Sequence, residues 1–319
     1  MKEFIKAVII KVYQFTYWML SFFIKENQYD VVIIAKHNNN IINYIKMNPD
    51  EIIGGITNNK SFRNFLEKYP KTKKVIAYEE YNIFSAVQQI IMILQTDKIV
   101  IDDYYAPLYG IDATKEIWNI WHSYAIYKKI GLDSPIYNNK SNLAVSRYRR
   151  NYKRINKLFV RSEIEKKIFM NSYNVTADKI IIDESFYRSQ YADISRSKQK
   201  HKKIVYAPTF RSYKYDFMNI YHKIQEQFPN YEVVINFHPI TLKDYPALKT
   251  YHNKNSIANL LENAEIFITD YSGLLIEIAD LYQDIKVYQV IDKDDYHKYL
   301  EINGINNDVY KQNYEILEI

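Results

Sequence analysis

Short apolar runs alternate along the chain with longer stretches in which apolar residues follow helical spacing. Residues 29–35 (YDVVIIA) are typical of a buried strand, whereas the stretch 82–96 places Ile83, Val87 and Ile90 on one helical face. This alternation predicts parallel sheets joined by crossover helices. The predicted strands are 29–35, 52–57, 74–78, 98–101, 116–121, 157–161, 179–182, 203–206, 231–237, 265–269 and 285–289, and the predicted helices are 82–96, 162–172, 216–227, 256–263 and 272–281.

The pattern runs twice, on either side of a basic polar stretch at 195–203 (SRSKQKHKK). Because 319 residues exceed one ordinary core, we expect two domains, at 28–195 and 203–319, with that stretch as the linker. The predicted fold class is α/β, with two doubly wound, Rossmann-like domains facing each other across a cleft. In open sheets of this class, ligands bind beyond the carboxyl ends of the strands.

Residues 1–27 are predicted to form an additional segment, an amphipathic helix. Its uncharged run at 12–24 is shorter than the ~20 apolar residues of a membrane-spanning helix. Trp18 and the pair Phe22 and Phe23 are bulky and apolar, and lysines interrupt and flank the segment, which is typical of a helix lying in a membrane interface. The alternative is a first helix packed on its own domain, and we favour the interfacial interpretation.

Composition narrows the chemistry. The chain has no cysteine, which excludes a disulfide scaffold, a thiolate metal site and a thiol nucleophile. It has six glycines and no common Gly-rich phosphate loop, so side chains and helix termini must hold any phosphate. A net charge of +6 suits an anionic substrate or an anionic membrane surface, and no signature of a nucleic-acid-binding module is present. The oligomeric state is left open.

Four short polar segments lie where strands are expected to give way to a loop or a helix. They are 121–123 (WHS), 206–211 (YAPTFR), 237–239 (FHP) and 269–273 (TDYSG). A histidine at the end of an apolar segment, such as His122, can act as a general base near neutral pH. Its position alone is equally consistent with a hydrogen-bonded interface histidine.

A proline ends each of two predicted strands, because proline cannot continue a hydrogen-bonded ladder. One proline directly precedes Thr209 and the other directly follows His238. We expect Thr209 and Arg211 to project from a loop into the cleft, where an arginine suits bidentate phosphate binding. The alternative is a surface arginine beside an ordinary turn. His238 is expected at the rim, where its imidazole could donate to a phosphate oxygen and take part in catalysis, although a lone histidine before proline is more often structural.

A helix is expected to begin near Ser272, where free backbone N–H groups and the helix dipole favour an anion. Asp270 and Ser272 are therefore candidate donor- or phosphate-binding residues, although Ser272 could be only an N-cap. Gly273 would let a ligand approach the backbone closely. Glu277, one turn into the helix, could reach a sugar or alditol hydroxyl, or it could be a solvated helix residue.

No spacing in the sequence predicts a metal site. The seven histidines are dispersed, and no H-E-x-x-H or paired-carboxylate pattern appears. Asp102 and Asp103 form the one acidic pair near a strand end, where they could bind Mg²⁺ or a hydroxyl, but a turn is the favoured interpretation. We therefore expect no metal and no other cofactor.

Taken together, the four segments resemble the CDP-glycerol glycerophosphotransferase family, which contains the primases and polymerases of teichoic acid synthesis. The match runs in order through His122 with its preceding tryptophan, 128–131 (KKIG), 206–211, 238–239 and 269–273. It covers residues 98–288. Each motif alone is weak, but four in this order are fairly specific.

The resemblance implies a GT-B fold, with CDP-glycerol or CDP-ribitol bound by the C-terminal domain and the acceptor served by the N-terminal domain. The acceptor would be a lipid-linked polymer or primer, and the protein would lie peripherally on the cytoplasmic face of the cell membrane. His122 would deprotonate an acceptor hydroxyl, which attacks the phosphorus attached to the alditol and releases CMP. The groups that would neutralise the pyrophosphate are His238, Arg211, Thr209 and Ser272.

The chain departs from the family pattern in three places. The family usually has Gly-Thr-Pro after its Trp-His, where this chain has 123–125 (SYA), and Gly273 replaces a second serine. Residues 183–188 (DESFYR) replace an expected Gly-x-Pro-Arg-x-Asp segment. These departures leave the alditol and the acceptor open. The length favours a primase-like or capsule transferase over the long processive polymerases.

Two other hypotheses remain open. The first is a GT-B glycosyltransferase that uses another nucleotide sugar, because the fold does not fix the donor. The second is a non-catalytic relative that acts as a membrane assembly subunit, which the altered motifs suggest. Since His122, His238 and Arg211 are all kept, we rank the non-catalytic hypothesis last.

Overall fold

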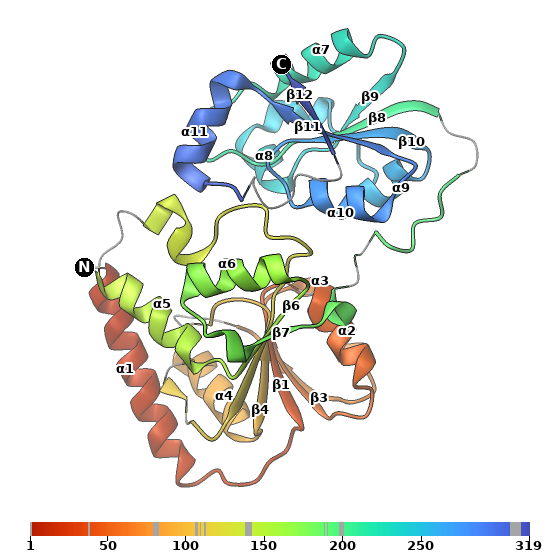
Figure 1. Cartoon of the computed structure of the whole chain (residues 1–319). Coiled ribbons are helices and arrows are strands. Elements are labelled where there is room, and N and C mark those ends of the chain that lie inside the picture. The colour runs from red at the N-terminus through yellow and green to blue at the C-terminus, as the bar shows by residue number, and fades with distance from the viewer. Residues whose placement is uncertain are drawn as a thin grey trace. The chain divides into compact units, whose positions relative to one another are not determined.

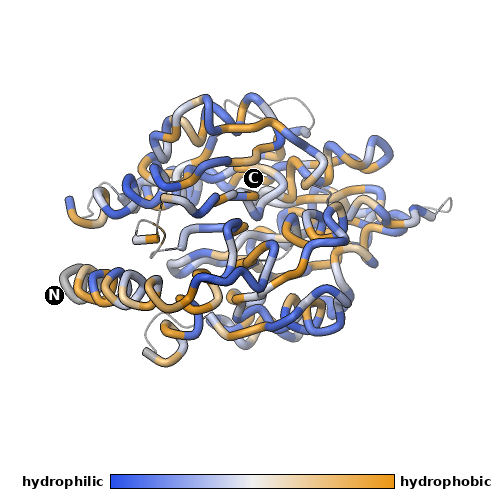
Figure 2. Tube along the Cα trace, turned by 90° about the horizontal axis from the view of Figure 1, so that it is seen from below, coloured by the Kyte–Doolittle hydropathy of each residue, from blue (hydrophilic) through white to orange (hydrophobic). Residues whose placement is uncertain are grey.

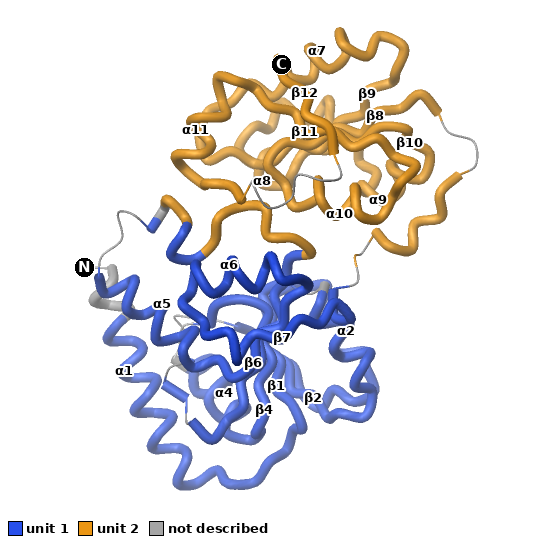
Figure 3. The backbone as a smooth tube through the Cα atoms, viewed as in Figure 1, with its two compact units in different colours: residues 1–123, 131–133, 137–188 blue, residues 124–130, 134–136, 189–319 orange. Residues whose placement is uncertain are grey.

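The chain folds into two compact α/β units (Figures 1 and 3). The computed structural model describes residues 2–37, 39–78, 83–105, 108, 110–111, 113–137, 142–187, 189, 191–197, 201–306 and 314–319. Unit 1 comprises Met1–Ser123, Gly131–Asp133 and Tyr137–Arg188, and unit 2 comprises Tyr124–Ile130, Ser134–Ile136 and Ser189–Ile319.

Unit 1 is built on a parallel sheet in the order β3-β2-β1-β4-β5-β6-β7, seven strands among the described residues. Helices cover both faces (Figure 1), so every residue of β1 and β2 is buried. Its strands are β1 Val31–Ala35, β2 Ile53–Thr57, β3 Thr72–Ile76, β4 Lys98–Ile101, β5 Glu116–Ile120, β6 Lys157–Val160 and β7 Ile180–Ile182, and its α-helices are α1 Lys2–Ser21, α2 Asn39–Met47, α3 Lys60–Lys68, α4 Ile83–Leu94, α5 Asn142–Arg154 and α6 Glu163–Tyr173.

Unit 2 contains a second parallel sheet, in the order β12-β11-β10-β8-β9. Two apolar clusters within this unit pack against the sheet. Its strands are β8 His201–Ala207, β9 Glu232–Ile235, β10 Ala264–Thr269, β11 Lys286–Ile291 and β12 Glu315–Glu318, and its α-helices are α7 Phe217–Gln227, α8 Pro239–Asp244, α9 Ile257–Leu261, α10 Leu274–Leu281 and α11 Lys293–Asn303. Two parallel sheets in two units confirm the predicted α/β class.

The strand order reverses once in each sheet. In unit 1, β1 lies between β2 and β4, and in unit 2, β8 lies between β9 and β10. At such a reversal, the loops after the two neighbouring strands leave in opposite directions and open a crevice for a ligand. The carboxyl ends of β1 and β4, and those of β8 and β10, are therefore the places to look for a site.

Helix α1 packs on unit 1 with one face and exposes apolar side chains on the other. One face packs on α4 and buries Ile10, Tyr13 and Tyr17, so the helix belongs to unit 1 and is not a separate segment. The opposite face exposes large apolar side chains. The hydropathy colouring of the Cα trace shows apolar positions interspersed with polar ones along this helix (Figure 2). These exposed side chains, here called the α1 apolar face, are Val8, Val12, Phe15, Trp18 and Met19 on the helix and, just beyond it, Phe22 and Phe23.

Several predicted boundaries were wrong. The linker expected at 195–203 overlaps β8, which begins at His201, and the last expected strand is followed by β12. The three asparagines at 38–40 were expected in a loop; the first lies outside the described residues, and α2 begins at the second. The unpredicted helices α3 and α11 are largely polar, and each begins with an asparagine or aspartate cap rather than an apolar run.

The domain boundary also differs from the expectation. Residues Tyr124–Ile130 and Ser134–Ile136 belong to unit 2, although they lie well inside the predicted N-terminal domain. Unit 2 then resumes at Ser189, before the predicted boundary at 195. The apolar pattern does not reveal this exchange, because the partner of the segment, around Ile305, lies far along the chain and outside any strand.

Gly131, between the two short segments that belong to unit 2, should be intolerant of substitution. Its φ is +54°, and an added Cβ would lie 2.6 Å from the carbonyl oxygen of Ser172. We expect Gly131→Ala to lower the free energy of unfolding by about 1–3 kcal/mol, measured by urea denaturation. Lys167→Ala, at an exposed position of α6, should change it by less than about 0.5 kcal/mol. A Gly131→Ala protein as stable as the wild type would contradict this account.

Candidate active site

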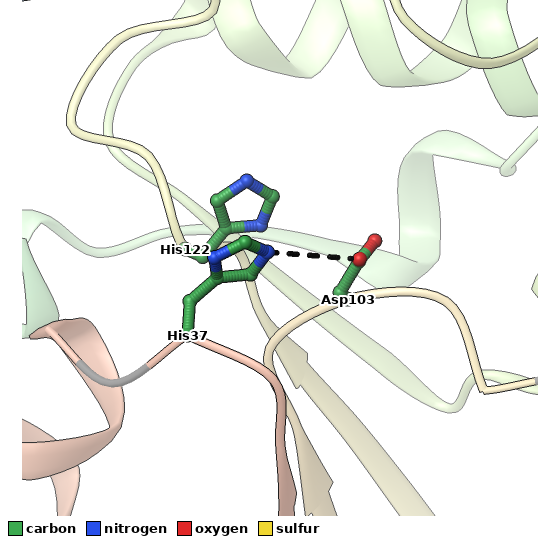
Figure 4. A group of neighbouring side chains, drawn as sticks. All are labelled: His37, Asp103 and His122. Atoms are coloured by element: carbon green, nitrogen blue, oxygen red, sulfur yellow. Dashed lines mark ion pairs between the residues drawn. The ribbon is translucent and has the colours of Figure 1, made fainter. Parts of the chain in front are cut away.

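The loops after β1, β4 and β5 bring His37, Asp103 and His122 together at the strand-order reversal of unit 1 (Figure 4). The two imidazole rings are stacked, with centroids 3.8 Å apart and planes inclined by 20°. His37 Nε2 lies 3.8 Å from Asp103 Oδ2. The predicted base therefore has a second histidine against its face.

Asp102 fixes this arrangement from beneath. Its carboxylate is buried and accepts hydrogen bonds from the backbone N–H of Lys36, at 2.9 Å, and of His37, at 2.7 Å. Its carbonyl oxygen lies 3.1 Å from His122 Nδ1. Because a carbonyl can only accept, Nδ1 carries the proton of a neutral His122, and Nε2 is left with a lone pair.

The electrostatics of the cluster keep His122 neutral. Burial, followed by the charge of the neighbouring His37, lowers the pKa of His122 to about 4. Asp103 raises the pKa of His37 against the opposing effect of burial, so His37 is the ring that takes up a proton first. His122 thus remains an unprotonated acceptor at neutral pH, which is the state a general base requires.

The same three side chains form a candidate metal site, because their ligand atoms lie within 4.8 Å of one another. A metal ion lies in the plane of each imidazole that binds it, at about 2 Å from the nitrogen. Two planes inclined by 20°, with ring centroids 3.8 Å apart, meet far beyond that bond length. In this arrangement the two histidines cannot share an ion, and the cluster is suited to proton transfer.

In unit 2, Arg211 lies at the corresponding reversal, but it does not project from its loop as the sequence predicted. Its side chain is 1% exposed and forms ion pairs with Asp270, at 2.8 Å, and with Asp295 of α11, at 2.9 Å. It also donates to the carbonyl of Thr209 at 2.9 Å. The guanidinium group of Arg211 is thus bonded to protein groups, and its expected contact with a phosphate stays a prediction.

Asp270 and Glu277 are also buried, contrary to their expected exposure to a ligand. Asp270 receives the backbone N–H of Thr209 at 2.8 Å and the Arg211 ion pair, so it joins the loops after β8 and β10. Glu277 is 9% exposed and accepts a hydrogen bond from the Ser189 hydroxyl at 2.5 Å. Both carboxylates are therefore structural in this arrangement.

Gly273 also has a role other than the one expected. A Cβ at this position would lie 3.3 Å from the carbonyl oxygen of Ala125. The close approach is thus made by the segment Tyr124–Ile130, which belongs to unit 2. The lack of a side chain at 273 leaves room for this backbone, and close approach of a ligand to Gly273 stays a prediction.

His238, Ser272 and Thr209 remain available to an anion in unit 2. Nδ1 of the exposed His238 accepts the backbone N–H of Ile240 at 3.2 Å, which leaves Nε2–H as a donor. The Ser272 hydroxyl accepts the backbone N–H of Leu274 at 3.2 Å and keeps its own proton to donate. The Thr209 hydroxyl is buried and has no hydrogen-bond partner among the described residues.

Sequence reasoning missed three residues that the structure brings to these clusters. His37 follows β1 directly, and its signal was a polar residue at a strand end, the same rule that singled out His122. Lys128 was noticed only as part of a motif, although its side chain lies half-buried near Asp270 and His238. Asp295 gave no signal, because an aspartate in the first turn of a helix is ordinary.

Two doubly wound α/β units, each with polar side chains at the reversal of its strand order, define a protein of the GT-B-like class. Residues 28–314 match the model of the CDP-Glycerol:Poly(glycerophosphate) glycerophosphotransferase family, and the chain belongs to that family. The resemblance carried by the four sequence segments is thereby confirmed.

Two curated relatives are teichoic acid glycerol-phosphate primases. The chain is 25% identical over 254 residues to that of Bacillus subtilis strain 168, covering 70% of this chain and 65% of the relative. It is 23% identical over 244 residues to that of Bacillus spizizenii strain W23, covering 70% and 64%. The chain therefore spans slightly less than two thirds of the length of these relatives.

Solved structures of the wall teichoic acid polymerase TagF share the fold. One of them, a variant soaked with CDPG, aligns with a TM-score of 0.66 at 15% identity, covering 99% of this chain and 85% of that one. Another TagF structure aligns with a TM-score of 0.61 at 15% identity and the same coverage. At this identity, the likeness establishes the architecture.

The stacked histidines predict a shift in proton affinity. In His37→Phe, a ring still covers His122 but the neighbouring positive charge is gone, so the pKa of His122 should rise from about 4. Resolved histidine signals in an NMR titration would measure it. His222→Phe, at an exposed position of α7, should leave the His122 titration unchanged. An identical His122 titration in His37→Phe and wild type would show that His37 does not influence the base.

Arg211 predicts a loss of stability in addition to any loss of activity. Arg211→Met would leave Asp270 and Asp295 buried without their partner, and should cost about 3–5 kcal/mol in the free energy of unfolding. Lys293→Met removes one partner of an exposed ion pair with Glu318 and should cost less than about 1 kcal/mol. Urea denaturation separates the two. Normal stability of Arg211→Met with lost donor binding would return Arg211 to a direct phosphate contact.

Proposed function

We propose that this protein transfers glycerol phosphate, or ribitol phosphate, from a CDP-alditol to a hydroxyl of a lipid-linked teichoic acid or capsule acceptor, releasing CMP. Family membership supports the donor class. The observation that carries the reaction is a neutral His122, held by its Nδ1–H on the Asp102 carbonyl, with a free lone pair on Nε2.

In the proposed reaction, His122 Nε2 takes the proton of the acceptor hydroxyl. The oxygen then attacks the phosphorus attached to the alditol. A new phosphorus–oxygen bond forms, the bond to the bridging oxygen of the pyrophosphate breaks, and CMP leaves with that electron pair. Because such a transition state develops negative charge on phosphate oxygens, positioned donors accelerate the transfer without covalent participation.

His238 and Ser272 are proposed to supply these donors in unit 2, with the Thr209 hydroxyl behind them. His238 has a free Nε2–H, and partial burial followed by the charge of Lys128 lowers its pKa, so it donates as a neutral imidazole. Ser272 lies two residues before the start of α10, where the positive end of the helix dipole favours an anion. Arg211 and Asp270 hold the two loops in place.

A primase-like acceptor is the favoured one. The two curated relatives carry the name teichoic acid glycerol-phosphate primase. We propose that this chain likewise adds the first alditol phosphate units to a lipid-linked disaccharide, with no cofactor beyond the CDP-alditol. A glycerophosphate-primed lipid is the competing acceptor and serves as the second arm of the test.

The activity test is CMP release from CDP-glycerol and, separately, from CDP-ribitol, in the presence of each lipid-linked acceptor. We expect acceptor-dependent CMP from one donor, and a rate lower by roughly 100- to 10,000-fold in His122→Gln. His222→Gln, at an exposed position, is the matched control and should keep the wild-type rate. If the folded wild type releases no CMP from either donor, or if UDP-sugars are turned over instead, the proposed donor is wrong.

The α1 apolar face is proposed to lie on an anionic membrane surface. Among the described residues, no helix combines the length and apolarity needed to cross a bilayer. The face instead exposes Phe15 and Trp18 on the helix and Phe22 just after its end, while the opposite side of the helix is buried in unit 1. Nearby lysines and a net charge of +6 favour anionic headgroups.

Vesicle binding tests this placement. The triple variant Phe15→Ser, Trp18→Ser, Phe22→Ser should lose most of its co-sedimentation with phosphatidylglycerol vesicles, because each buried methylene contributes about 0.8 kcal/mol. A control triple variant at other exposed positions should bind as the wild type does; it replaces Ile52, Ile240 and Ile316 by serine. Equal binding by all three proteins would remove α1 from the membrane contact.

A further inference from the structure

The segment Tyr124–Ile130 is fixed to unit 2 by a continuous set of backbone contacts. Lys129 donates its N–H to the carbonyl of Gly304 at 3.2 Å, and the backbone N–H of Asn306 donates to the carbonyl of Tyr127 at 2.8 Å. The Asn306 side-chain amide donates to the carbonyl of Lys128 at 3.1 Å, and Lys128 forms an antiparallel bridge with Ile305. These hydrogen bonds hold the backbone of Lys128 against residues 304–306 of unit 2.

The side chain of Lys128 is half-buried yet lacks an ion-pair partner within the described part of the chain. Its ammonium group lies 5.7 Å from the centre of the Tyr299 ring. Burial lowers the pKa of Lys128, and the charge of Asp270 opposes this effect. Since removing an ammonium group from water is costly unless hydrogen bonds replace the lost water, this geometry is suited to an incoming anion.

The neighbouring side chains show where that anion would lie. Lys128 is close enough to His238 to lower the pKa of its imidazole. Arg211, by contrast, already has a carboxylate on each side and cannot provide a free charge. Lys128 and the Nε2–H of His238 are thus the cationic and the neutral donor that unit 2 offers together.

A different role must be distinguished from anion binding. The buried cluster of Arg211, Asp270 and Asp295 carries one positive and two negative charges, so Lys128 could serve only to balance the remaining negative charge. In a balancing role, Lys128 would stabilise the protein without contacting a ligand. It predicts that loss of Lys128 lowers stability and leaves anion affinity unchanged.

We propose that Lys128 binds the diphosphate group of the donor, acting with His238 in unit 2. The donor, and with it the diphosphate, rests on the proposed function, whereas the preference for an anion rests on the placement of Lys128 and His238. The same segment begins directly after His122 and Ser123, so one stretch of chain carries both the proposed base and the proposed diphosphate ligand.

Calorimetric titration of the full-length protein with CDP-glycerol, inorganic pyrophosphate and cytidine tests the proposal. Lys128→Met should bind both anions about 10- to 100-fold more weakly, the effect of removing a hydrogen bond to a charged group. Cytidine, which has no phosphate, should bind equally to wild type and variant. Lys129→Met removes the same charge from the next, exposed residue and should leave all three affinities unchanged. Lys128→Arg should recover part of the loss.

The outcomes separate Lys128 from the donor assignment. Wild type that binds pyrophosphate but not CDP-glycerol, with Lys128→Met losing pyrophosphate, supports Lys128 and overturns the donor. Wild type and Lys128→Met with equal affinity for both anions overturns the proposal, and so does a wild type that binds neither anion. Urea denaturation accompanies each titration, because reduced stability with unchanged affinity would assign Lys128 to charge balance.

Discussion

Parallel strands leave their carboxyl ends on one edge of a sheet, and the candidate chemistry of this protein depends on the two points where the strand order reverses. In unit 1 the reversal lies between β1 and β4, and in unit 2 it lies between β8 and β10. Loops diverge at these points, so side chains from separate strands can meet without crossing the core. Each cluster described above is located at one of the two reversals.

A buried aspartate secures the reversal in both units by the same means. Asp102 directly follows β4 and holds the loop after the neighbouring β1 through the N–H groups of Lys36 and His37. Asp270 directly follows β10 and holds the loop after the neighbouring β8 through the N–H of Thr209. A buried carboxylate is tolerated only when hydrogen bonds or a counter-charge satisfy it, so each aspartate ties two loops into one rigid arrangement.

The sequence was informative about the strands and about His122, because buried parallel strands are continuous apolar runs and the residues after them stand out. It was misleading for Arg211, since the motif gave no sign that Asp295, from a helix much later in the chain, would complete a buried ion pair. His37 was missed for the same reason: its significance comes from ring stacking with a residue two strands away in the sheet. Single-strand patterns identify which residues end a strand, but not which partners from distant elements meet there.

Two positions at which the chain departs from the family pattern, 125 and 273, lie next to each other in unit 2. Ala125 stands where the family usually has proline, and Gly273 stands where it usually has a second serine. In the structure, the carbonyl oxygen of Ala125 lies 3.3 Å from the position that a Cβ on Gly273 would occupy, tighter than ordinary van der Waals contact. A side chain at 273 would press on this backbone, so a glycine there suits the path that 124–130 takes through unit 2. Glycine at 273 therefore fits the close packing of unit 2 around the segment that carries Lys128.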